Sequence, residues 1–246
     1  MLRAVTFDLW QTLILDTPEG LGRARADRVR GLQAVLARHG LWVQHDRVAV
    51  AYDAVGSRLE GIWQNQRDVG SHAQVRLLLE DLGLDRQVPS EGPFMDALDD
   101  AYCLPILSAL PMVNGGAREV LKSLEHRGLR LALICNTGRT PGKMLRLVLD
   151  RLALAPFLRV LTFSDEVGLR KPHPEIFWRT LSALGVAPEH AAHVGDDVTT
   201  DVAGAKGVGM RSVHLQHAAS ANRESKDTQV IPTLQALPAV LFPPSH

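Results

Sequence analysis

The stretch AVTFDLWQTL, residues 4–13, joins an apolar run to a carboxylate. Ala4 to Phe7 reads as a short strand that is buried on both faces, as in a parallel sheet. Asp8 stands where this run ends, and Thr12 follows shortly after it. In an open sheet of this kind, ligands bind at the carboxyl ends of the strands. The stretch therefore predicts a strand that carries a functional carboxylate at its end.

Four further apolar runs, each short and nearly uninterrupted, follow in the second half of the chain: Leu129 to Cys135, Val160 to Phe163, Ala191 to Val194 and Ser212 to Leu215. Between the predicted strands, apolar residues recur at the spacing of one helix face. One such series is Ala117, Val120, Leu121 and Leu124. Alternating strands and helices are typical of βαβ units. The sequence therefore predicts an α/β fold with a Rossmann-like parallel sheet.

The residues between the first predicted strand and the second follow a helical pattern, in which Val29 and Leu32 lie on one face. A crossover between parallel strands needs only about a dozen residues. The stretch is therefore too long to be a simple connection. We expect two domains, a core made of residues 1–15 and 111–246 and a smaller helical domain made of residues 16–110.

Charge and cysteine content argue against several classes of protein. Lysine plus arginine and aspartate plus glutamate each total 27, and this balance gives no support for binding to nucleic acid or to an acidic membrane surface. No apolar run approaches the roughly 20 residues that span a bilayer. The two cysteines, Cys103 and Cys135, are too few for a disulfide framework. We therefore expect a cytoplasmic protein that acts on a small molecule, with no nucleic-acid or membrane partner.

Polar side chains gather at the ends of the predicted strands or on the loops just after them. They are Asp8 and Thr12; Cys135, Asn136 and Thr137 in LICNTG (residues 133–138); Lys171 in GLRKPHPEIF (residues 168–177); and Asp196, Asp197 and Asp201 in HVGDDVTTD (residues 193–201). Each piece alone has an ordinary explanation, such as a turn, a solvated lysine or carboxylates at a helix N-terminus. Together they predict carboxylates, small donor groups and one cation at a single edge of the sheet.

In its stretches FDLWQTL, GLRKPHPEIF and VGDDVTTDVAGAKGVGM, the chain resembles the haloacid dehalogenase-like hydrolases. The resemblance covers residues 1–15 and about 111–215. The helical residues between these two parts resemble the cap that the superfamily places after its first motif. The resemblance implies the strand order 5-4-1-2-3, counting the predicted strands along the chain. In that order the strands that lead to Asp8 and Asp196 are neighbours.

The resemblance also implies which groups would handle a phosphate. Asp8 would attack phosphorus and form an aspartyl-phosphate, and Lys171 would hold Asp8 and the phosphate oxygens as a point charge. Backbone N–H groups after Cys135 and a nearby hydroxyl would bind the phosphate. Cys135 stands where the superfamily has Ser or Thr, so either Thr137 supplies the hydroxyl or the backbone N–H of Asn136 suffices. The predicted substrate-binding residues are Thr12, Cys135, Asn136 and Thr137.

A magnesium site follows from the same resemblance. Mg²⁺ prefers oxygen ligands and needs few protein carboxylates. Its ligands would be Asp8, the main-chain carbonyl of Trp10 and Asp196. Either Asp201 or Asp197 would hold the waters of the metal. We therefore expect Mg²⁺ as the cofactor.

Trp10 departs from the phosphatases of the superfamily, in which a second Asp stands there as general acid and base. An indole can only donate a hydrogen bond, and loss of a positioned acid or base costs about 10² to 10⁴ in rate. We therefore expect a Mg²⁺-dependent phosphohydrolase of small phosphorylated metabolites that is limited to activated phosphates, whose leaving groups need no proton.

Two alternatives stay open. A catalytically impaired protein on the same fold would bind phosphate or regulate a partner without turnover. A 2-haloacid dehalogenase would use Asp8 on carbon without a metal, but the crowded acids of VGDD argue against it because they would repel one another without a cation. In a phosphatase, the choice of substrate would fall to residues of the helical domain: Arg58, Trp63, Arg67 and Arg76.

Overall fold

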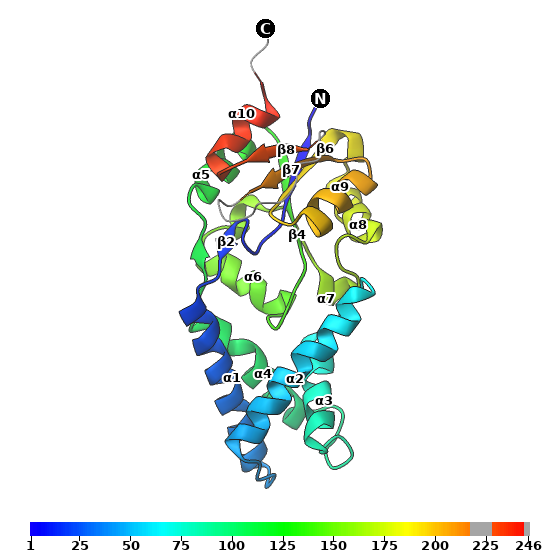
Figure 1. Cartoon of the computed structure of the whole chain (residues 1–246). Coiled ribbons are helices and arrows are strands. Elements are labelled where there is room, and N and C mark those ends of the chain that lie inside the picture. The colour runs from blue at the N-terminus through cyan, green and yellow to red at the C-terminus, as the bar shows by residue number, and fades with distance from the viewer. Residues whose placement is uncertain (217–227, 244–246) are drawn as a thin grey trace.

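Strand β1 (Ala4–Phe7) lies in the middle of a six-stranded sheet in which all neighbouring strands are parallel. The computed structural model describes residues 1–216 and 228–243, and Figure 1 shows the sheet at the end of the molecule that holds the N-terminus. Across the sheet the order is β5 (Val160–Phe163), β4 (Arg130–Cys135), β1, β6 (Ala191–Gly195), β7 (Arg211–Leu215) and β8 (Gln229–Ile231).

The predicted α/β class and parallel sheet are confirmed. The five predicted strands occur in the predicted order, and the strands that lead to Asp8 and Asp196 are neighbours. The sheet differs from the prediction in one detail, because β8 adds a sixth strand beside β7. Only three residues long, β8 is too short to stand out as an apolar run in the sequence.

Helices cover both faces of the sheet, because side chains along each strand alternate between the faces. In β4, Leu131, Leu133 and Cys135 pack against α5, α6 and α10, whereas Ala132 and Ile134 pack against α8 and α9. The helices and turns of the core are α5 (Ala117–His126), α6 (Gly142–Arg151), η2 (Ala155–Phe157), α7 (Ser164–Val167), α8 (Pro174–Leu184), η3 (Pro188–His190), η4 (Val198–Val202), α9 (Ala203–Gly207), η5 (Leu234–Ala236) and α10 (Leu237–Leu241).

A separate group of helices, which we call the helical segment, lies at the opposite end of the molecule (Figure 1). It consists of α1 (Pro18–Arg38), α2 (His45–Gln64), α3 (Ser71–Leu82), α4 (Pro93–Cys103) and η1 (Leu104–Leu107). The chain leaves and re-enters the core through two short antiparallel strands, β2 (Ile14–Leu15) and β3 (Met112–Val113). The division into domains at residues 15/16 and 110/111 stays a prediction, which this pairing supports.

Helix α6 joins the helical segment to the sheet. Its Leu145 and Leu149 belong to the apolar core against the sheet, whereas Met144 and Val148 belong to the core of the helical segment. Trp10 is partly buried and packs against both cores. Trp10, two positions after Asp8, is therefore part of the boundary between the helical segment and the core.

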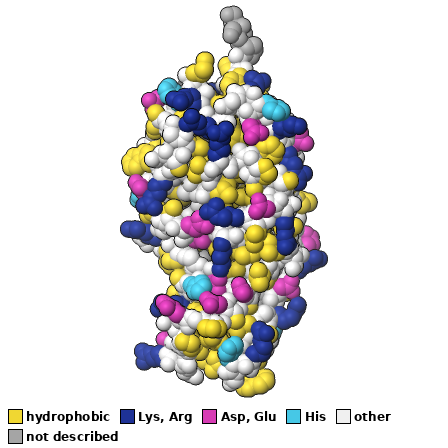
Figure 2. All heavy atoms as spheres, turned by 180° about the vertical axis from the view of Figure 1, so that it is seen from behind, with side chains coloured by type: hydrophobic (Ala, Val, Ile, Leu, Met, Phe, Trp, Pro, Cys, Tyr) yellow, Lys and Arg dark blue, Asp and Glu magenta, His cyan; other side chains and the backbone are white. Residues whose placement is uncertain are grey.

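Charges of both signs are interspersed over the face of the molecule that Figure 2 shows. At moderate salt, the interaction between exposed charges is largely screened beyond about 10 Å.

Among residues 1–216 and 228–243, no helix combines the length and the apolar character that a membrane span requires.

Candidate active site

Asp8 lies at the carboxyl end of β1 and is 7% exposed. Lys171 extends toward Asp8 from the loop between α7 and α8. Its Nζ is 2.6 Å from Asp8 Oδ1 and 2.6 Å from Asp201 Oδ1. All three side chains are buried. One cation therefore lies between two carboxylates in a place where water screens their charges weakly.

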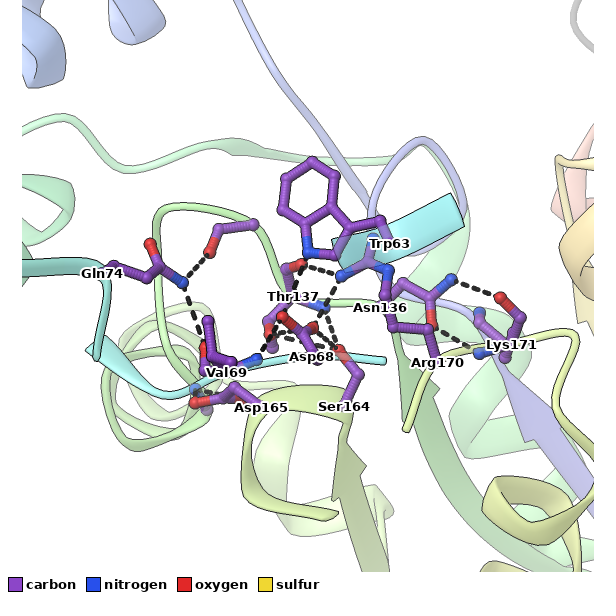
Figure 3. A network of polar contacts seen from close by, with 12 residues as sticks. Trp63, Asp68, Val69, Gln74, Asn136, Thr137, Ser164, Asp165, Arg170 and Lys171 are labelled. Carbon is purple, nitrogen blue, oxygen red and sulfur yellow. Dashed lines mark hydrogen bonds and ion pairs between the residues drawn. The ribbon is translucent and has the colours of Figure 1, made fainter. Parts of the chain in front are cut away.

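Asn136, directly after β4, holds the backbone of Lys171 in place. Its Oδ1 accepts a hydrogen bond from Lys171 N at 2.8 Å, and its Nδ2 donates to the Lys171 carbonyl at 3.0 Å (Figure 3). These two bonds fix the residue from which the lysine side chain extends. Asn136 thus positions Lys171, and its predicted contact with phosphate stays a prediction.

The π-helical turn η4 places Asp201 after β6. Such turns are frequent at functional sites. Asp197 begins the turn, and its carboxylate accepts hydrogen bonds from the backbone N–H groups of Thr199 and Thr200, each at 2.7 Å. Gly195 lets Asp201 approach the end of β6, because a Cβ there would lie 2.2 Å from Asp201 Cγ. Asp197 is therefore used as a cap, and Asp201 points into the site.

His193 on β6 supports Asp201 from behind. Its Nε2 is 3.1 Å from Asp201 Oδ1, and its Nδ1 is 2.7 Å from Thr6 Oγ1. Burial lowers the pKa of His193, so the ring is neutral at pH 7. We assign the proton to Nε2, which donates to Asp201, while Nδ1 accepts from the Thr6 hydroxyl. Asp201 is thus held by His193, by Lys171 and by the backbone N–H of Asp197 at 3.1 Å.

Three carboxylates converge at this edge of the sheet. Asp8, Asp196 and Asp201 each offer an oxygen, and these atoms lie within 4.8 Å of one another. Lys171 supplies one positive charge against these three negative ones. The site therefore carries surplus negative charge in a largely buried place.

Burial and the neighbouring charges shift the pKa values of the three acids in different directions. Burial raises the pKa of Asp8 to about 7; Lys171 opposes the rise, and Asp201 and Asp196 add to it. Burial and the charge of Asp201 raise the pKa of Asp196 to about 6. Burial alone would raise the pKa of Asp201, but Lys171 and His193 lower it below its ordinary value. Oxygen donors that hold surplus charge fit a divalent cation such as Mg²⁺.

The carboxylate of Asp197 and the ring of Trp10 are not part of this carboxylate group. Asp197 is exposed, and its carboxylate is occupied by the turn that it caps. The geometry therefore favours Asp201 over Asp197 as the second acid of the predicted metal site. The Trp10 ring lies at the boundary with the helical segment, and the role of its carbonyl stays a prediction.

The other predicted phosphate-binding residues have different surroundings. Thr12 Oγ1 is buried and has no hydrogen-bond partner among the described residues, so it is available to a ligand. Burial raises the pKa of the Cys135 thiol well above its ordinary value, and the thiol is a small apolar group here. Thr137 Oγ1 donates to Asp68 Oδ2 at 3.2 Å and contacts Ser164 Oγ at 3.1 Å. Protein atoms therefore already engage the Thr137 hydroxyl.

Asp68, from the loop between α2 and α3, is the centre of a buried polar network that joins the helical segment to the core (Figure 3). Its Oδ2 is 2.6 Å from Arg170 Nη1 and accepts hydrogen bonds from the Ser164 and Thr137 hydroxyls. Its Oδ1 accepts from Trp63 Nε1 at 3.1 Å and from the next backbone N–H at 2.8 Å. Both oxygens of the Asp68 carboxylate thus accept hydrogen bonds, from groups of the helical segment and of the core.

The two chain segments that carry Asp68 and Arg170 also pair through their backbones. Asp68 N donates to the Gly168 carbonyl at 3.2 Å, and Arg170 N donates to the Gln66 carbonyl at 3.0 Å. The loop that carries Lys171 is therefore attached to the helical segment directly before the lysine.

We predict that Asp68→Asn lowers the free energy of unfolding by about 3 kcal/mol or more. The substitution leaves the Arg170 charge without its buried partner, and breaking a buried pair is costly. The matched control is Asp81→Asn, which removes a partly exposed partner of Arg58 and should cost less than about 1 kcal/mol. Urea unfolding of the two variants checks this, and equal losses would contradict it.

A cavity of about 330 Å³, which we call the junction cavity, lies between the helical segment and the core. Trp10 and Asn136 line it from the core, and Arg28 and Trp63 line it from the helical segment. Asp8 is not part of its wall, but Trp10 is two residues from Asp8. The cavity therefore leads from the helical segment to the loops that surround Asp8.

Of the four residues predicted to choose the substrate, Trp63 lines the junction cavity. Arg58 is instead paired with two acidic residues of α3, at 2.6 and 3.1 Å. Arg67 and Arg76 are exposed and are not among the residues that line the cavity. The structure therefore gives no support to a substrate contact for these three arginines.

Several residues of the site and its surroundings were not predicted from the sequence. They are Arg28, Asp68, Arg139, Arg170 and His193. The sequence could have marked Arg170 and His193 as site residues, because they lie inside the motifs GLRKPHPEIF and HVGDDVTTD. Arg28 and Asp68 stand among the many charged residues of the helical segment, where no motif marks them.

Comparisons with known proteins agree with this geometry. Residues 2–209 match the family described as haloacid dehalogenase-like hydrolase. The glyceraldehyde 3-phosphate phosphatase of Pyrococcus abyssi is 32% identical over 217 residues, which are 88% of this chain and 82% of that protein. The crystal structure of a HAD phosphatase from Thermococcus onnurineus has a TM-score of 0.62 at 25% identity and covers 98% of both chains. A 2-haloacid dehalogenase from Pseudomonas syringae, with a TM-score of 0.69 at 24% identity over 98% of both chains, shares the fold.

Proposed function

Because the chain belongs to the haloacid dehalogenase-like hydrolases, we propose that it is a Mg²⁺-dependent phosphatase of small phosphorylated molecules with Asp8 as the nucleophile. The observation that carries the proposal is the buried Lys171 between Asp8 and Asp201, beside Asp196. The phosphatase activity named for the similar protein of Pyrococcus abyssi supports it.

In the proposed reaction Asp8 attacks phosphorus in line with the leaving oxygen, and water then hydrolyses the aspartyl-phosphate. Burial disfavours the charge of Lys171, but Asp201 and Asp8 raise its pKa, so it stays a cation that offsets the negative phosphate. Mg²⁺, held by Asp8, Asp196 and the carbonyl of Trp10 with Asp201 behind its waters, would supply further charge neutralisation.

The two alternatives differ from this proposal in what they require of the site. A metal-free dehalogenase would have to keep three clustered carboxylates with one lysine, and that single positive charge leaves the repulsion among the acids largely uncompensated. An impaired binding protein would bind phosphate at the same residues without releasing it from an ester. Measuring phosphate release therefore separates it from an enzyme.

We predict that Asp196→Asn weakens Mg²⁺ binding more than Asp201→Asn does. Asp201 is already occupied by Lys171 and His193, so we assign it an outer role, which is worth about 10- to 100-fold in metal affinity. Asp197→Asn is the matched control and should leave Mg²⁺ affinity unchanged. Calorimetric titration of the three variants with Mg²⁺ measures this. The reverse order would mean that the metal is assigned to the wrong acid.

Trp10 sets a second feature of the proposed function. Its ring packs against both apolar cores, and the residue lines the junction cavity two positions after Asp8. An indole cannot protonate a leaving group or activate water. We therefore propose that the enzyme prefers activated phosphates, in which the leaving group needs no proton.

We predict that Trp10→Asp raises kcat/KM on an alkyl phosphate by at least about tenfold relative to acetyl phosphate, because it restores a general acid and base. Trp10→Phe is the control, since it retains an aromatic ring without a proton to transfer. Loss of the partly buried indole also costs stability, by about 3–5 kcal/mol at most, so both variants are assayed where they are folded. An unchanged ratio in a folded Trp10→Asp variant that still binds Mg²⁺ would contradict the proposal.

The cellular location and the partner stay predictions of the same account. Cys103 and Cys135 are both free and buried, which agrees with a reducing compartment such as the cytoplasm. A small phosphorylated molecule is the proposed partner.

A further inference from the structure

The junction cavity contains a buried arginine that forms no ion pair with a carboxylate of the described residues. Arg28, on α1, lines the cavity and is 6% exposed. Arginine is rarely this buried unless its charge is paired, because an unpaired buried charge is costly. A buried guanidinium at the wall of a cavity therefore points to an anionic ligand.

Neutral acceptors hold the guanidinium of Arg28 in a fixed orientation. Its Nε donates to the Tyr102 carbonyl at 2.9 Å, its Nη1 to the Tyr52 hydroxyl at 3.2 Å, and its Nη2 to Thr140 Oγ1 at 2.9 Å. A guanidinium has five N–H groups, so these three bonds leave two of the five for another acceptor. A side chain that is already anchored loses little entropy when it binds a ligand.

Arg139 lines the same cavity and is held by the same aromatic residues. Its Nη1 donates to the Tyr102 hydroxyl at 3.2 Å, and its guanidinium lies 4.2 Å from the centre of the Tyr52 ring. Tyr102 in turn donates to Gln74 Oε1 at 2.8 Å. The chain has only two tyrosines, and both hold these arginines. Two guanidinium groups are therefore fixed at the cavity wall beside the same two tyrosines.

The remaining charges of the cavity wall do not neutralise these two. Arg170 lines the cavity as well, but Asp68 pairs with it at 2.6 Å. Asp16 is the one acidic residue of the wall among the described residues, and it is half-buried, which raises its pKa. Arg28 and Arg139 thus give the cavity an excess of positive charge.

We infer that Arg28 and Arg139 form a subsite for a second anionic group, so that the substrates are small phosphate monoesters that also carry a carboxylate or a second phosphate. This inference rests on the proposed function for the phosphate end, which we assign to Asp8, two residues before Trp10 of the cavity wall. The cavity of about 330 Å³ is at the small end of the range for ligand pockets, about 300–1,000 Å³. It suits a ligand of a few carbon atoms.

The test measures binding without turnover, by calorimetry on the Asp8→Asn variant with Mg²⁺. One pair of probes is 3-phosphoglycerate and glycerol 3-phosphate, which differ in a carboxylate. A second pair is propane-1,3-diol bisphosphate and 3-hydroxypropyl phosphate, which differ in a phosphate. We expect the more acidic member of at least one pair to bind about 10- to 100-fold more tightly, since bonds to charged groups have this effect. The pair that shows the preference identifies the second group.

Substitutions then assign the preference to the subsite. In the same background, Arg28→Gln should reduce it to less than about threefold, and Arg28→Lys should keep part of it because the charge remains. Arg139→Gln gives the same comparison where Arg28→Gln does not fold. Arg30→Gln is the control, because Arg30 is exposed, paired with Asp27 at 2.9 Å and outside the cavity wall.

The outcomes separate the subsite from the proposed function. Equal affinities within both pairs, or a preference that survives both Arg28→Gln and Arg139→Gln, would overturn the subsite. Release of phosphate by the wild-type protein without any preference would leave the phosphatase and overturn the subsite. A preference in binding, with no phosphate released from acetyl phosphate by the wild-type protein, would overturn the phosphatase and support the subsite.

Discussion

Replacing Lys171 with methionine is expected to lower the free energy of unfolding by about 3–5 kcal/mol and to remove the proposed activity. The lysine is 1% exposed in its side chain and lies between Asp8 and Asp201. Without it, the three converging carboxylates lose the one lysine that contacts two of them. Urea unfolding at pH 7 to 8 measures the loss.

Two conditions should restore part of that stability. Mg²⁺ binds the folded state and should offset the loss, by about 2.7 kcal/mol at a concentration one hundred times its dissociation constant.

Burial already raises the pKa of Asp8 to about 7 in the presence of Lys171, so its ionised form is disfavoured in the folded protein. Lowering the pH to about 5 protonates such acids and should shrink the loss. Lys122→Met, at an exposed position, is the control. A Lys171→Met variant as stable as this control would contradict the account.

Replacing Asp8 with asparagine is expected to reduce phosphate release by at least about 10⁴-fold, which is the scale of losing a catalytic nucleophile. The amide has nearly the shape of the acid but is a poor nucleophile and a weaker ligand for Mg²⁺. The free energy of unfolding of this variant, in contrast, should not fall. Because the ionised form of Asp8 is disfavoured by burial, the neutral amide should leave the metal-free protein as stable as the wild type or more so at pH 8.

Thermal unfolding and turnover of the Asp8→Asn variant test both statements. The stabilisation that Mg²⁺ gives to the wild type should be smaller in the variant, because one carboxylate ligand is lost. Asp165→Asn is a suitable comparison, because Asp165 is a nearby acid whose pKa burial raises to about 6 but which caps α6 through Gly142 N, 3.1 Å away. Undiminished turnover in a folded Asp8→Asn variant would remove Asp8 from the mechanism.

The core of the fold could be predicted because its strands are buried on both faces. Runs such as those of β1 and β4 are apolar at nearly every position, so they stand out in the sequence. The two-residue strands β2 and β3 and the edge strand β8 carry no such run. Their pairing depends on where the rest of the fold brings the chain, which a local pattern does not contain.

The residues that meet at Asp8 could be predicted for a related reason. Parallel strands end at one edge of the sheet, so polar residues that follow different strands come together there. The structure brings Asp8, Lys171, Asp196 and Asp201 together in this way. The choice between Asp197 and Asp201 depended on the π-helical turn, because that turn decides which of the two carboxylates caps a backbone and which enters the site.

The residues of the junction cavity could not be predicted in the same way. In the helical segment, successive side chains point in directions about 100° apart, so a side chain's direction follows from how the helices pack. Arg28 and Arg58 look alike in the sequence, yet Arg28 lines the cavity and Arg58 pairs with acids of α3. Asp68 reaches Arg170 because a loop of the helical segment pairs with a loop of the core. Only the three-dimensional structure shows these pairs.

The most direct test of the central claim is the release of inorganic phosphate from acetyl phosphate by the wild-type protein and by Asp8→Asn, each with Mg²⁺ and with a chelator in its place. The account predicts release by the wild type with Mg²⁺, and no release above background either with the chelator or by the variant. Release that persists in folded Asp8→Asn, or the absence of release by the wild type with Mg²⁺, would contradict it.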